Sequence, residues 1–474
     1  MKNDRREFLK SSCKALSMVA AATQLRHFGA VSVLAQEAAD REPEGNDYKA
    51  LVCVFLGGGN DSNNMVVPNY DAGYNEYFAA RGSQNLAIPR ANLRPITPPS
   101  MGGQVYGLHP NLPDIHALWE QGKVAVTCNV GPLVRPLTRA EYQSGSAPRP
   151  YQLFSHSDQV EQHRTAISSF RSSTGWGGRL ADRTAILNQG AAISMITSIA
   201  GANVFNIGLN SQPLIVTPAP TPLNQVLTLT GYGTAADELA RRAALDSIRT
   251  RDLDRTMIQA TSALTQQAVN VSLQLSQNPV LTVTFPATTL GNQLAQVAKI
   301  MKFRTSLNMS RQIFFVQLGG FDTHSGQLNG QGNLLTQLNA ALKAFYDETV
   351  AQGIASQVTT FTMSDFSRTF NPAGSGSGVG SDHGWAAHHF VIGGAVNGGN
   401  FYGRPSSNGT LFPTLVNNGP DDADTRGRFI PSTSVEQYAG TLSKWFGLPA
   451  ADIPIAFPNA GNFSTMDLGF MQPG

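Results

Sequence analysis

The segment from residue 312 to residue 366 constrains the fold of this chain most strongly. An apolar run with β-branched residues covers 312–318, and a second covers 358–363, which predicts two buried strands. Between them one helical stripe is apolar, and we expect this helix to begin after Asn333 as N-cap and to end at Gly353. The stripe consists of Leu334, Leu335, Leu338, Ala341, Leu342 and Phe345. A strand, a helix and a strand of this length predict a parallel crossover unit and an α/β fold.

Further elements extend this α/β pattern along the chain. Strands are predicted in the apolar runs within 49–56 and 123–136, the second of which follows a helical stretch. Residues 190–232 lack helical periodicity and are rich in Thr, Val, Asn, Gly and Pro, so we expect a β-rich insertion there. The remaining predicted helices lie within 234–276, 289–304 and 434–446. No internal repeat interrupts this pattern, and we expect one domain over residues 49–474.

The N-terminus is typical of a twin-arginine export signal. Arg5 and Arg6 precede Phe-Leu, a short apolar run and a small-residue cleavage site after Ala35. The alternative is a chance arginine pair before an ordinary helix. The signal predicts a leader over 1–35, a charged linker over 36–48, passage through the twin-arginine translocase, and a periplasmic or secreted protein. No run is long enough for a membrane helix, so we expect no membrane span in the mature chain.

Charge and cysteine usage exclude several classes of function. The leader holds six Lys/Arg and two Asp/Glu, so the net charge of +2 for the full sequence becomes about −2 in the mature chain, which argues against a nucleic-acid partner. Only Cys53 and Cys128 remain after the leader, too few for an iron–sulfur cluster or a thiolate zinc site. They form either one disulfide or two buried free thiols. Their apolar surroundings favour free thiols.

Four polar clusters lie directly after predicted strands or beside the Gly/Ser-rich tract 371–381. Because the carboxyl ends of parallel strands share one edge of a sheet, we expect the clusters to lie close together. Carboxylates mixed with imidazoles suit zinc, manganese or iron(II) better than calcium, which predicts a site for one or two divalent ions. The candidate ligands are Asp61, Asp322, His324, Asp365, Asp382 and His383.

Each candidate ligand also has a purely structural interpretation. In that interpretation Asp61 caps a turn, Asp322 and His324 cap the following helix or bond to each other, and Asp365 caps a loop and pairs with Arg368. Two further histidines, at positions 388 and 389, are individually more typical of a core. The occurrence of all the clusters at strand ends is what favours a metal site.

Several short motifs carry a family resemblance over nearly the whole mature chain. They are GGND (58–61), YGLHPNLP (106–113), GGFDTH (319–324), SDFSRT (364–369), SDHG (381–384) and GGAVNGGNFYG (393–403). With the arginine pair, they resemble the bacterial family known as domain of unknown function 1501. That family is in turn similar to the alkaline phosphatase and sulfatase superfamily, which implies a three-layer α/β/α fold with a mostly parallel central sheet. The family usually has Glu and Gly where this chain has Asp365 and Ser367.

The resemblance implies roles for the candidate ligands. Asp61 matches the first ligand, Asp322 and His324 the middle pair, Asp365 the acid of the next pair and His383 the late histidine. In the other register Asp382 and His383 form the pair, and His388 or His389 is the late ligand. The chain departs from the superfamily in its Asp-x-His spacing and in Phe366, which stands where a ligand histidine is expected.

The nucleophile is the least defined member of the site. Cys128 lacks the pattern of formylglycine sulfatases and is assigned to the core, while Thr127 and Thr138 are weak candidates. The cluster LFSHSDQVEQHR (153–164) is a better one, and Ser155 and His156 match the family there. The alternative for Ser155 is a role as the N-cap of a following helix.

These observations predict an exported metal-dependent hydrolase of phosphate or sulfate esters, acting on a small molecule or a polysaccharide. Arg368 would bind an oxygen of the transferred group. The alternative is a non-catalytic protein that binds metal or anionic glycan on a decayed hydrolase site, favoured by Phe366 and the missing nucleophile. A surface protein without any site is the third interpretation.

Overall fold

The computed structural model describes residues 48–223, 235–251 and 278–473, with scattered residues between 252 and 277. The predicted leader over 1–35, the linker up to residue 47 and the end of the predicted insertion, 224–232, lie outside the described residues. In the described part of the chain, no helix is both long enough and apolar enough to cross a membrane.

A nine-stranded central sheet forms the middle of the molecule. Its strand order is β11-β5-β10-β9-β1-β8-β6-β7, and β12 pairs with β5. Of these described strands only β10 runs antiparallel to its neighbours, β5 and β9, so the sheet is mostly parallel, as predicted. The strands are β1 (Lys49–Leu56), β5 (Val124–Gly131), β6 (Ile196–Ser198), β7 (Leu214–Ile215), β8 (Arg311–Leu318), β9 (Val358–Ser364), β10 (Ala387–Gly393), β11 (Asn400–Tyr402) and β12 (Thr433–Ser434).

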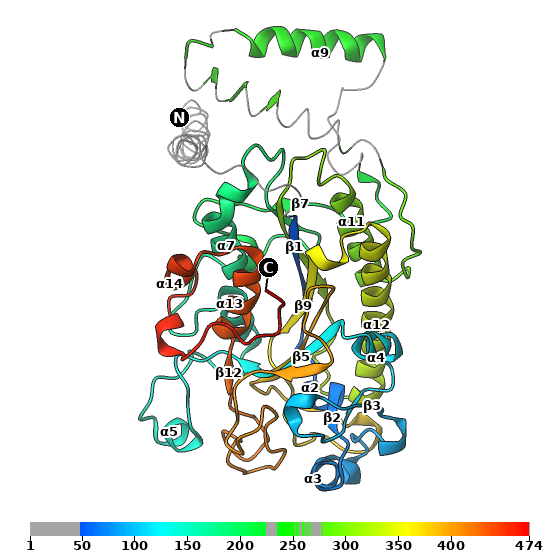
Figure 1. Cartoon of the computed structure of the whole chain (residues 1–474), viewed down its shortest axis with the longest axis vertical. Coiled ribbons are helices and arrows are strands. Elements are labelled where there is room, and N and C mark those ends of the chain that lie inside the picture. Colours follow the sequence, from blue (N-terminus) through cyan, green and yellow to red (C-terminus); the bar gives the residue numbers. More distant parts are fainter. Residues whose placement is uncertain are drawn as a thin grey trace, which may run out of the picture.

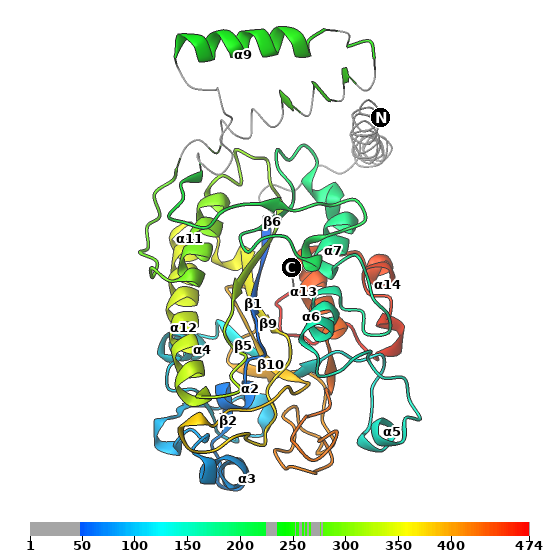
Figure 2. The same cartoon turned by 180° about the vertical axis from the view of Figure 1, so that it is seen from behind.

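Helices cover both faces of this sheet, which gives the expected three-layer α/β/α architecture (Figures 1 and 2). One face carries α4 (Pro113–Glu120), α11 (Thr289–Lys302) and α12 (Gln327–Ala351), and the other carries α6 (His156–Thr165), α7 (Trp176–Thr184) and α13 (Val435–Phe446). Side chains of β1 point alternately to the two faces of the sheet. Val52 and Val54 pack into the core that contains α12, and Leu51 and Phe55 pack into the core that contains α13. Because successive side chains of a strand point to opposite faces, a strand buried on both sides reads as a continuous apolar run.

The two cysteines follow the same alternation. Both Cys53 and Cys128 are free and buried, which confirms the interpretation as two buried thiols. Cys53 belongs to the core that contains α13, and Cys128 belongs to the core that contains α12. They therefore lie on opposite faces of the sheet, where no disulfide can join them.

The crossover unit β8–α12–β9 is present, and both of its strands pair in parallel with β1. The predicted helix start is wrong. Helix α12 begins at Gln327 after the N-cap Gly326, so Asn333 lies within the helix rather than at its cap. The side chains of Gln327 and Gln331 are anchored on Asp61 and Asn60, which stabilises two turns whose glycines would otherwise disfavour a helix.

The other predicted elements have mixed outcomes. Helices α11 and α13 confirm the predictions, and α13 begins at the N-cap Ser434 with a capping box. Within 190–223 the two short strands β6 and β7 extend the central sheet beyond β8 rather than forming a β-rich unit of their own. Helix α9 (Ala236–Arg249) covers part of the predicted helical region and contains no buried residue.

A smaller subdomain lies near the end of β1. It contains the three-stranded sheet β2-β4-β3, made of β2 (Val66–Pro68), β4 (Tyr106–Leu108) and β3 (Arg94–Ile96). The short helix α2 (Ser62–Met65) joins it to β1, and helix α3 (Asp71–Arg81) lies between β2 and β3. The short helices α5 (Arg139–Ser144) and α14 (Ile453–Ala456) lie in connections elsewhere.

Candidate metal centre

Three chain segments meet at one edge of the central sheet. Asp322 and His324 follow the carboxyl end of β8, Asp365 follows β9, and Asp382 and His383 precede the antiparallel strand β10. The amino end of β10 lies at the same edge as the carboxyl ends of its neighbours, because β10 runs the other way. The strand arrangement thus brings together residues that are far apart in sequence.

A fourth segment supplies His156, the first residue of α6. Phe154, two residues before His156, has a positive φ of 67°, so the chain turns sharply just before the helix. His156 and His383 lie against each other, with ring centroids 4.3 Å apart. Helix α6 thereby delivers an imidazole to the cluster from outside the sheet.

Three imidazoles direct their Nε2 atoms at one carboxylate oxygen, Asp322 Oδ1. The distances from that oxygen are 3.4 Å to His156, 3.1 Å to His324 and 3.6 Å to His383. The Nε2 atoms of His324 and His383 are 3.0 Å apart. We refer to Asp322 and these three histidines as the Asp322 cluster.

The opposite ring nitrogen of each histidine has an oxygen partner. His156 Nδ1 lies 2.8 Å from Asp365 Oδ2, His324 Nδ1 lies 3.0 Å from Asp382 Oδ1, and His383 Nδ1 lies 2.8 Å from the carbonyl oxygen of Phe154. Carboxylate and carbonyl oxygens accept hydrogen bonds, so each Nδ1 carries a proton, and each imidazole in its neutral form then has a lone pair on Nε2.

This assignment makes the centre of the cluster rich in electron pairs. With neutral imidazoles, three Nε2 lone pairs and a carboxylate oxygen face one another, an arrangement that a bound cation would stabilise. His156 Nε2 is buried and has no hydrogen-bond partner. A histidine held at Nδ1 by a carboxylate, with a free Nε2, is the arrangement typical of metal ligands.

The pKa shifts of the cluster residues differ in direction. Partial burial opposes ionisation of Asp322, but the hydrogen bond and charge of Arg368 hold its pKa below the usual range. The hydrogen bond to Asp365 raises the pKa of His156, although burial opposes this. Burial lowers the pKa of His383, and the neighbouring charges of His156 and Arg368 add to that effect.

The donor spacing fits a tetrahedral metal ion. The donor atoms of His156, Asp322 and His383 all lie within 4.8 Å of one another. Zinc bound at about 2.0–2.1 Å places tetrahedral ligands roughly 3.3 Å apart, close to the two measured distances from Asp322 Oδ1 to these histidines. The side chain of Asp322 is 46% exposed and that of His156 is 34% exposed, so the cluster opens to solvent. Three protein donors and an open side are typical of catalytic rather than structural zinc sites.

Arg368 lies behind the cluster instead of facing a substrate. Its side chain is 0% exposed, and its Nη1 donates to Asp322 Oδ1 at 2.6 Å. It also donates to the carbonyl oxygens of Gly58 and Ser381. The guanidinium therefore orients Asp322, and the expected contact with a transferred group does not fit this enclosed position.

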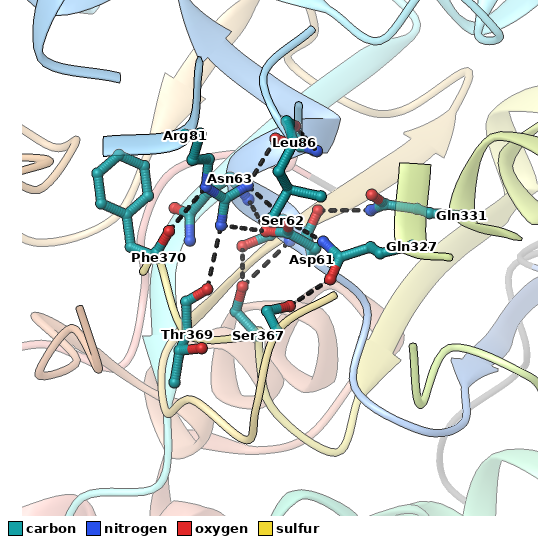
Figure 3. A network of polar contacts seen from close by, with 12 residues as sticks. Asp61, Ser62, Asn63, Arg81, Leu86, Gln327, Gln331, Ser367, Thr369 and Phe370 are labelled. Carbon is teal, nitrogen blue, oxygen red and sulfur yellow. Dashed lines mark hydrogen bonds and ion pairs between the residues drawn. The ribbon is translucent and has the colours of Figure 1, made fainter. Parts of the chain in front are cut away.

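Asp61 does not join the Asp322 cluster. Its carboxylate is buried in an ion pair with Arg81, at 2.6 Å, and it also accepts from Gln327 (Figure 3). Its other oxygen accepts from the backbone N–H of Asn63, which makes Asp61 the N-cap of α2. The structural interpretation as a cap describes this residue better than a role as first ligand.

Ser155 and the other nucleophile candidates are engaged in other contacts or buried. Ser155 Oγ donates to Asp158 Oδ2 at 2.7 Å, so its hydroxyl is held at the start of α6. Thr138 is exposed and caps α5. Thr127 and Cys128 are buried in β5.

His388 and His389 both lie in β10 and are buried. Burial lowers the pKa of His388 to about 3. His388 accepts from the backbone N–H of Asn129 and stacks on Phe412. Both are core histidines, and the structure does not support the register in which one of them is the late ligand.

Phe366 occupies the position after Asp365 where a ligand histidine is expected. Its ring stacks on His383, with centroids 4.8 Å apart at 28°, and lies 4.8 Å from the ring of His156. An aromatic ring at this position fixes the planes of two imidazoles by packing. The residue that departs from the superfamily pattern therefore supports the cluster from the side.

Two arginines near the cluster were not predicted from the sequence. Arg426 pairs with Asp382 Oδ2 and keeps 43% of its side chain exposed. Arg428 donates to the carbonyl oxygen of His383 at 2.9 Å and lies 4.1 Å above the ring of Phe154. They lie in an irregular loop about 45 residues after their partners. No strand or helix periodicity in the sequence points to that loop.

The model of the protein family of unknown function DUF1501 matches residues 48–411. The chain belongs to this family. The match covers all members of the Asp322 cluster and ends before Arg426 and Arg428. No curated protein matches the chain.

Solved structures with related folds show low similarity to this family member. The lipoteichoic acid synthase LtaP from Listeria monocytogenes is 7% identical, with a TM-score of 0.30 over 83% of this chain and 79% of that one. The PsFucS1 sulfatase from Pseudoalteromonas sp. is 10% identical, with a TM-score of 0.29 over 78% and 67%. Alkaline phosphatase from the Antarctic bacterium TAB5 is 10% identical, with a TM-score of 0.26 over 73% and 92%.

Proposed function

We propose that this DUF1501 protein is an exported, metal-dependent hydrolase of phosphate or sulfate esters. The observation that carries the proposal is the convergence of three histidine Nε2 atoms on Asp322 Oδ1, at 3.1–3.6 Å, with every Nδ1 held by an oxygen acceptor. One zinc or manganese ion held by His156, Asp322 and His383 would act as a Lewis acid toward an ester oxygen.

The chain itself would supply orientation, charge and a proton acceptor. Asp365 and Arg368 would fix His156 and Asp322 in position. Arg426 places a partly exposed guanidinium beside the cluster, so it would attract the anionic group of the substrate. His324 is held by Asp382 at Nδ1, and its Nε2 would accept the proton of an attacking water.

Water is proposed as the nucleophile because Ser155, the best hydroxyl candidate, is engaged by Asp158. The same observation favours the second candidate function. A site with ligands and no hydroxyl nucleophile would also suit a protein that binds metal or an anionic glycan without turnover, and Phe366 in place of a ligand histidine supports that alternative.

Turnover of aryl phosphate and aryl sulfate esters separates the two candidate functions. Purified protein loaded with zinc or manganese should hydrolyse at least one ester class. The Asp322→Ala and His156→Ala variants should lose about 100-fold or more of that activity. His116→Ala changes a histidine of α4 that lies outside the cluster, and it should retain full activity. Metal binding without turnover of either ester would support the non-catalytic alternative.

We also propose that the protein reaches the periplasm or the outside of the cell through the twin-arginine pathway. The supporting observation is the Arg5-Arg6 pair with its apolar run and small-residue site. Replacing both arginines by lysine should retain the precursor in the cytoplasm. Export of that variant at the normal rate would contradict the proposal.

A further inference from the structure

The ion pair between Asp61 and Arg81 is fully enclosed, with 0% exposure of both side chains. We infer that this pair is a positioning device for the Asp322 cluster, which holds the two segments that carry Arg368 and His383. The inference rests on the proposed function insofar as it concerns metal affinity. Its structural part concerns only how these segments are held.

One connection runs through the guanidinium of Arg81. Its Nε donates to the carbonyl oxygen of Phe370 at 2.9 Å, and its Nη2 donates to that of Thr369 at 3.2 Å. Thr369 is the residue after Arg368. Its hydroxyl accepts from the backbone N–H of Asp382 at 2.9 Å, and its own N–H donates to the Asp382 carbonyl at 2.8 Å. Arg81 thereby fixes one segment directly and the second through Thr369.

The other connection runs through the carboxylate of Asp61 (Figure 3). Gln327 Nε2 donates to Asp61 Oδ2 at 2.5 Å, and Gln327 Oε1 accepts from the hydroxyl of Ser381. The Ser381 carbonyl accepts from Arg368, whose Nη1 binds Asp322. A continuous chain of hydrogen bonds therefore links Asp61 to the central carboxylate of the cluster.

The contacts of Asp61 leave it no capacity for a metal. Oδ2 accepts from Arg81 and Gln327, while Oδ1 accepts from Asn63 and from the second nitrogen of Arg81. Because both charges are buried, removing either one leaves the other uncompensated. The segments that depend on the pair would then rearrange.

Two variants test this inference. Asp61→Asn removes the negative charge of the ion pair. Ser381→Ala removes only the hydroxyl that binds Gln327, so this second variant tests the inference if Asp61→Asn does not fold. Glu348→Gln is the matched control, because Glu348 is a buried acid that accepts from Thr282 and Val283 near the far end of α12. It should destabilise the protein without touching the cluster.

The first readout is zinc affinity, measured by competition with a chromogenic chelator. Loss of a residue that positions a metal ligand typically weakens metal affinity by about 10–100-fold. Both test variants should therefore weaken zinc binding by at least tenfold, while the control should not. Unchanged affinity in a folded Asp61→Asn variant, or in Ser381→Ala if the former is unfolded, would overturn the inference.

The second readout is amide hydrogen exchange, which needs no metal. The Thr369 N–H donates to Asp382 and the Gly384 N–H donates to the Ser367 carbonyl, both at 2.8 Å. These two amides should exchange at least tenfold faster in the test variants than in the control, relative to amides of β1. Equal exchange would overturn the inference. Wild-type protein that binds no zinc would instead contradict the proposed function, and the exchange result would still decide the positioning role.

Discussion

At the scale of single residues, the two nitrogens of each imidazole in the Asp322 cluster have different partners. Asp365, Asp382 and the Phe154 carbonyl bind the Nδ1 side. In the neutral imidazole, the Nε2 side then points at Asp322 with a lone pair. A carboxylate behind a histidine both fixes its tautomer and makes it a better ligand. Asp365 is therefore more useful as a partner of His156 than as a ligand of its own.

Glu436, in the first turn of α13, is a buried acid away from the cluster. One of its oxygens accepts from Asn459 at 3.2 Å, and the other has no hydrogen-bond partner. Burial raises the pKa of Glu436 to about 7, against an ordinary value of 4.5. Because the folded pKa is the higher one, the stabilising contribution of this group is complete below pH 4.5 and is lost as the pH rises to about 7.

Glu436→Gln should remove this dependence. Relative to wild type, the variant should gain up to about 3 kcal/mol in free energy of unfolding at pH 8, and almost nothing at pH 4.5. Urea unfolding at both pH values measures the difference. Glu76→Gln, at an exposed position in α3, serves as the control. A gain for Glu436→Gln of equal size at both pH values would contradict the raised pKa.

At the scale of elements, helix α12 brings side chains from its first two turns to the end of β1. Gln327 and Gln331 bind Asp61 and Asn60, so the early start of this helix belongs to the same network as the buried ion pair. Local sequence gives no reason for that start, because glycines at 330 and 332 weaken the first turns. Contacts across the fold determine where the helix begins.

Asn333→Ala distinguishes the two possible helix starts. Asn333 is exposed and lies in the interior of α12, so alanine should stabilise the protein by about half a kcal/mol. If Asn333 were the N-cap, the same change would cost about 1 kcal/mol. Ser434→Ala, at the true N-cap of α13, should show that cost. Thermal unfolding of both variants gives the sign.

Most of the sheet and part of the cluster are predictable from the sequence, for one physical reason. Buried parallel strands are continuous apolar runs, and the residues after them share one edge of the sheet, so strand periodicity alone groups Asp322, His324 and Asp365. His383 lies beside the Gly/Ser-rich tract in the sequence, and it reaches the same edge because the strand after it, β10, is antiparallel. The position of His156 on the first turn of α6 could not be derived from that periodicity. Arg426 was missed because an irregular loop returns it to the site.

Asp61 shows the limit of grouping residues by strand ends. It follows β1 at the same edge as the other candidates, yet Arg81 takes its carboxylate. Arg81 lies twenty residues later in the sequence, at the end of α3. A pattern of strand ends cannot show whether a buried carboxylate already has a cationic partner. That partner, rather than position alone, separates Asp61 from Asp322.

At the scale of the whole molecule, two large hydrophobic cores hold a mostly parallel sheet from both sides, and the antiparallel strand β10 carries Asp382 and His383 back to the shared edge. Segments from four parts of the chain thus meet around the Asp322 cluster. The proposed metal ion would bind where these segments meet, because the inward-facing atoms, Asp322 Oδ1 and the histidine Nε2 atoms, can all donate an electron pair.

Metal content of the folded protein tests the proposed metal site most directly. Elemental analysis after equilibration with zinc and manganese and removal of excess ions should find about one ion per chain in the wild type. Asp322→Ala and His156→Ala should each lose it, and His116→Ala should keep it. Wild-type protein that retains no more metal than the folded Asp322→Ala variant would contradict the site.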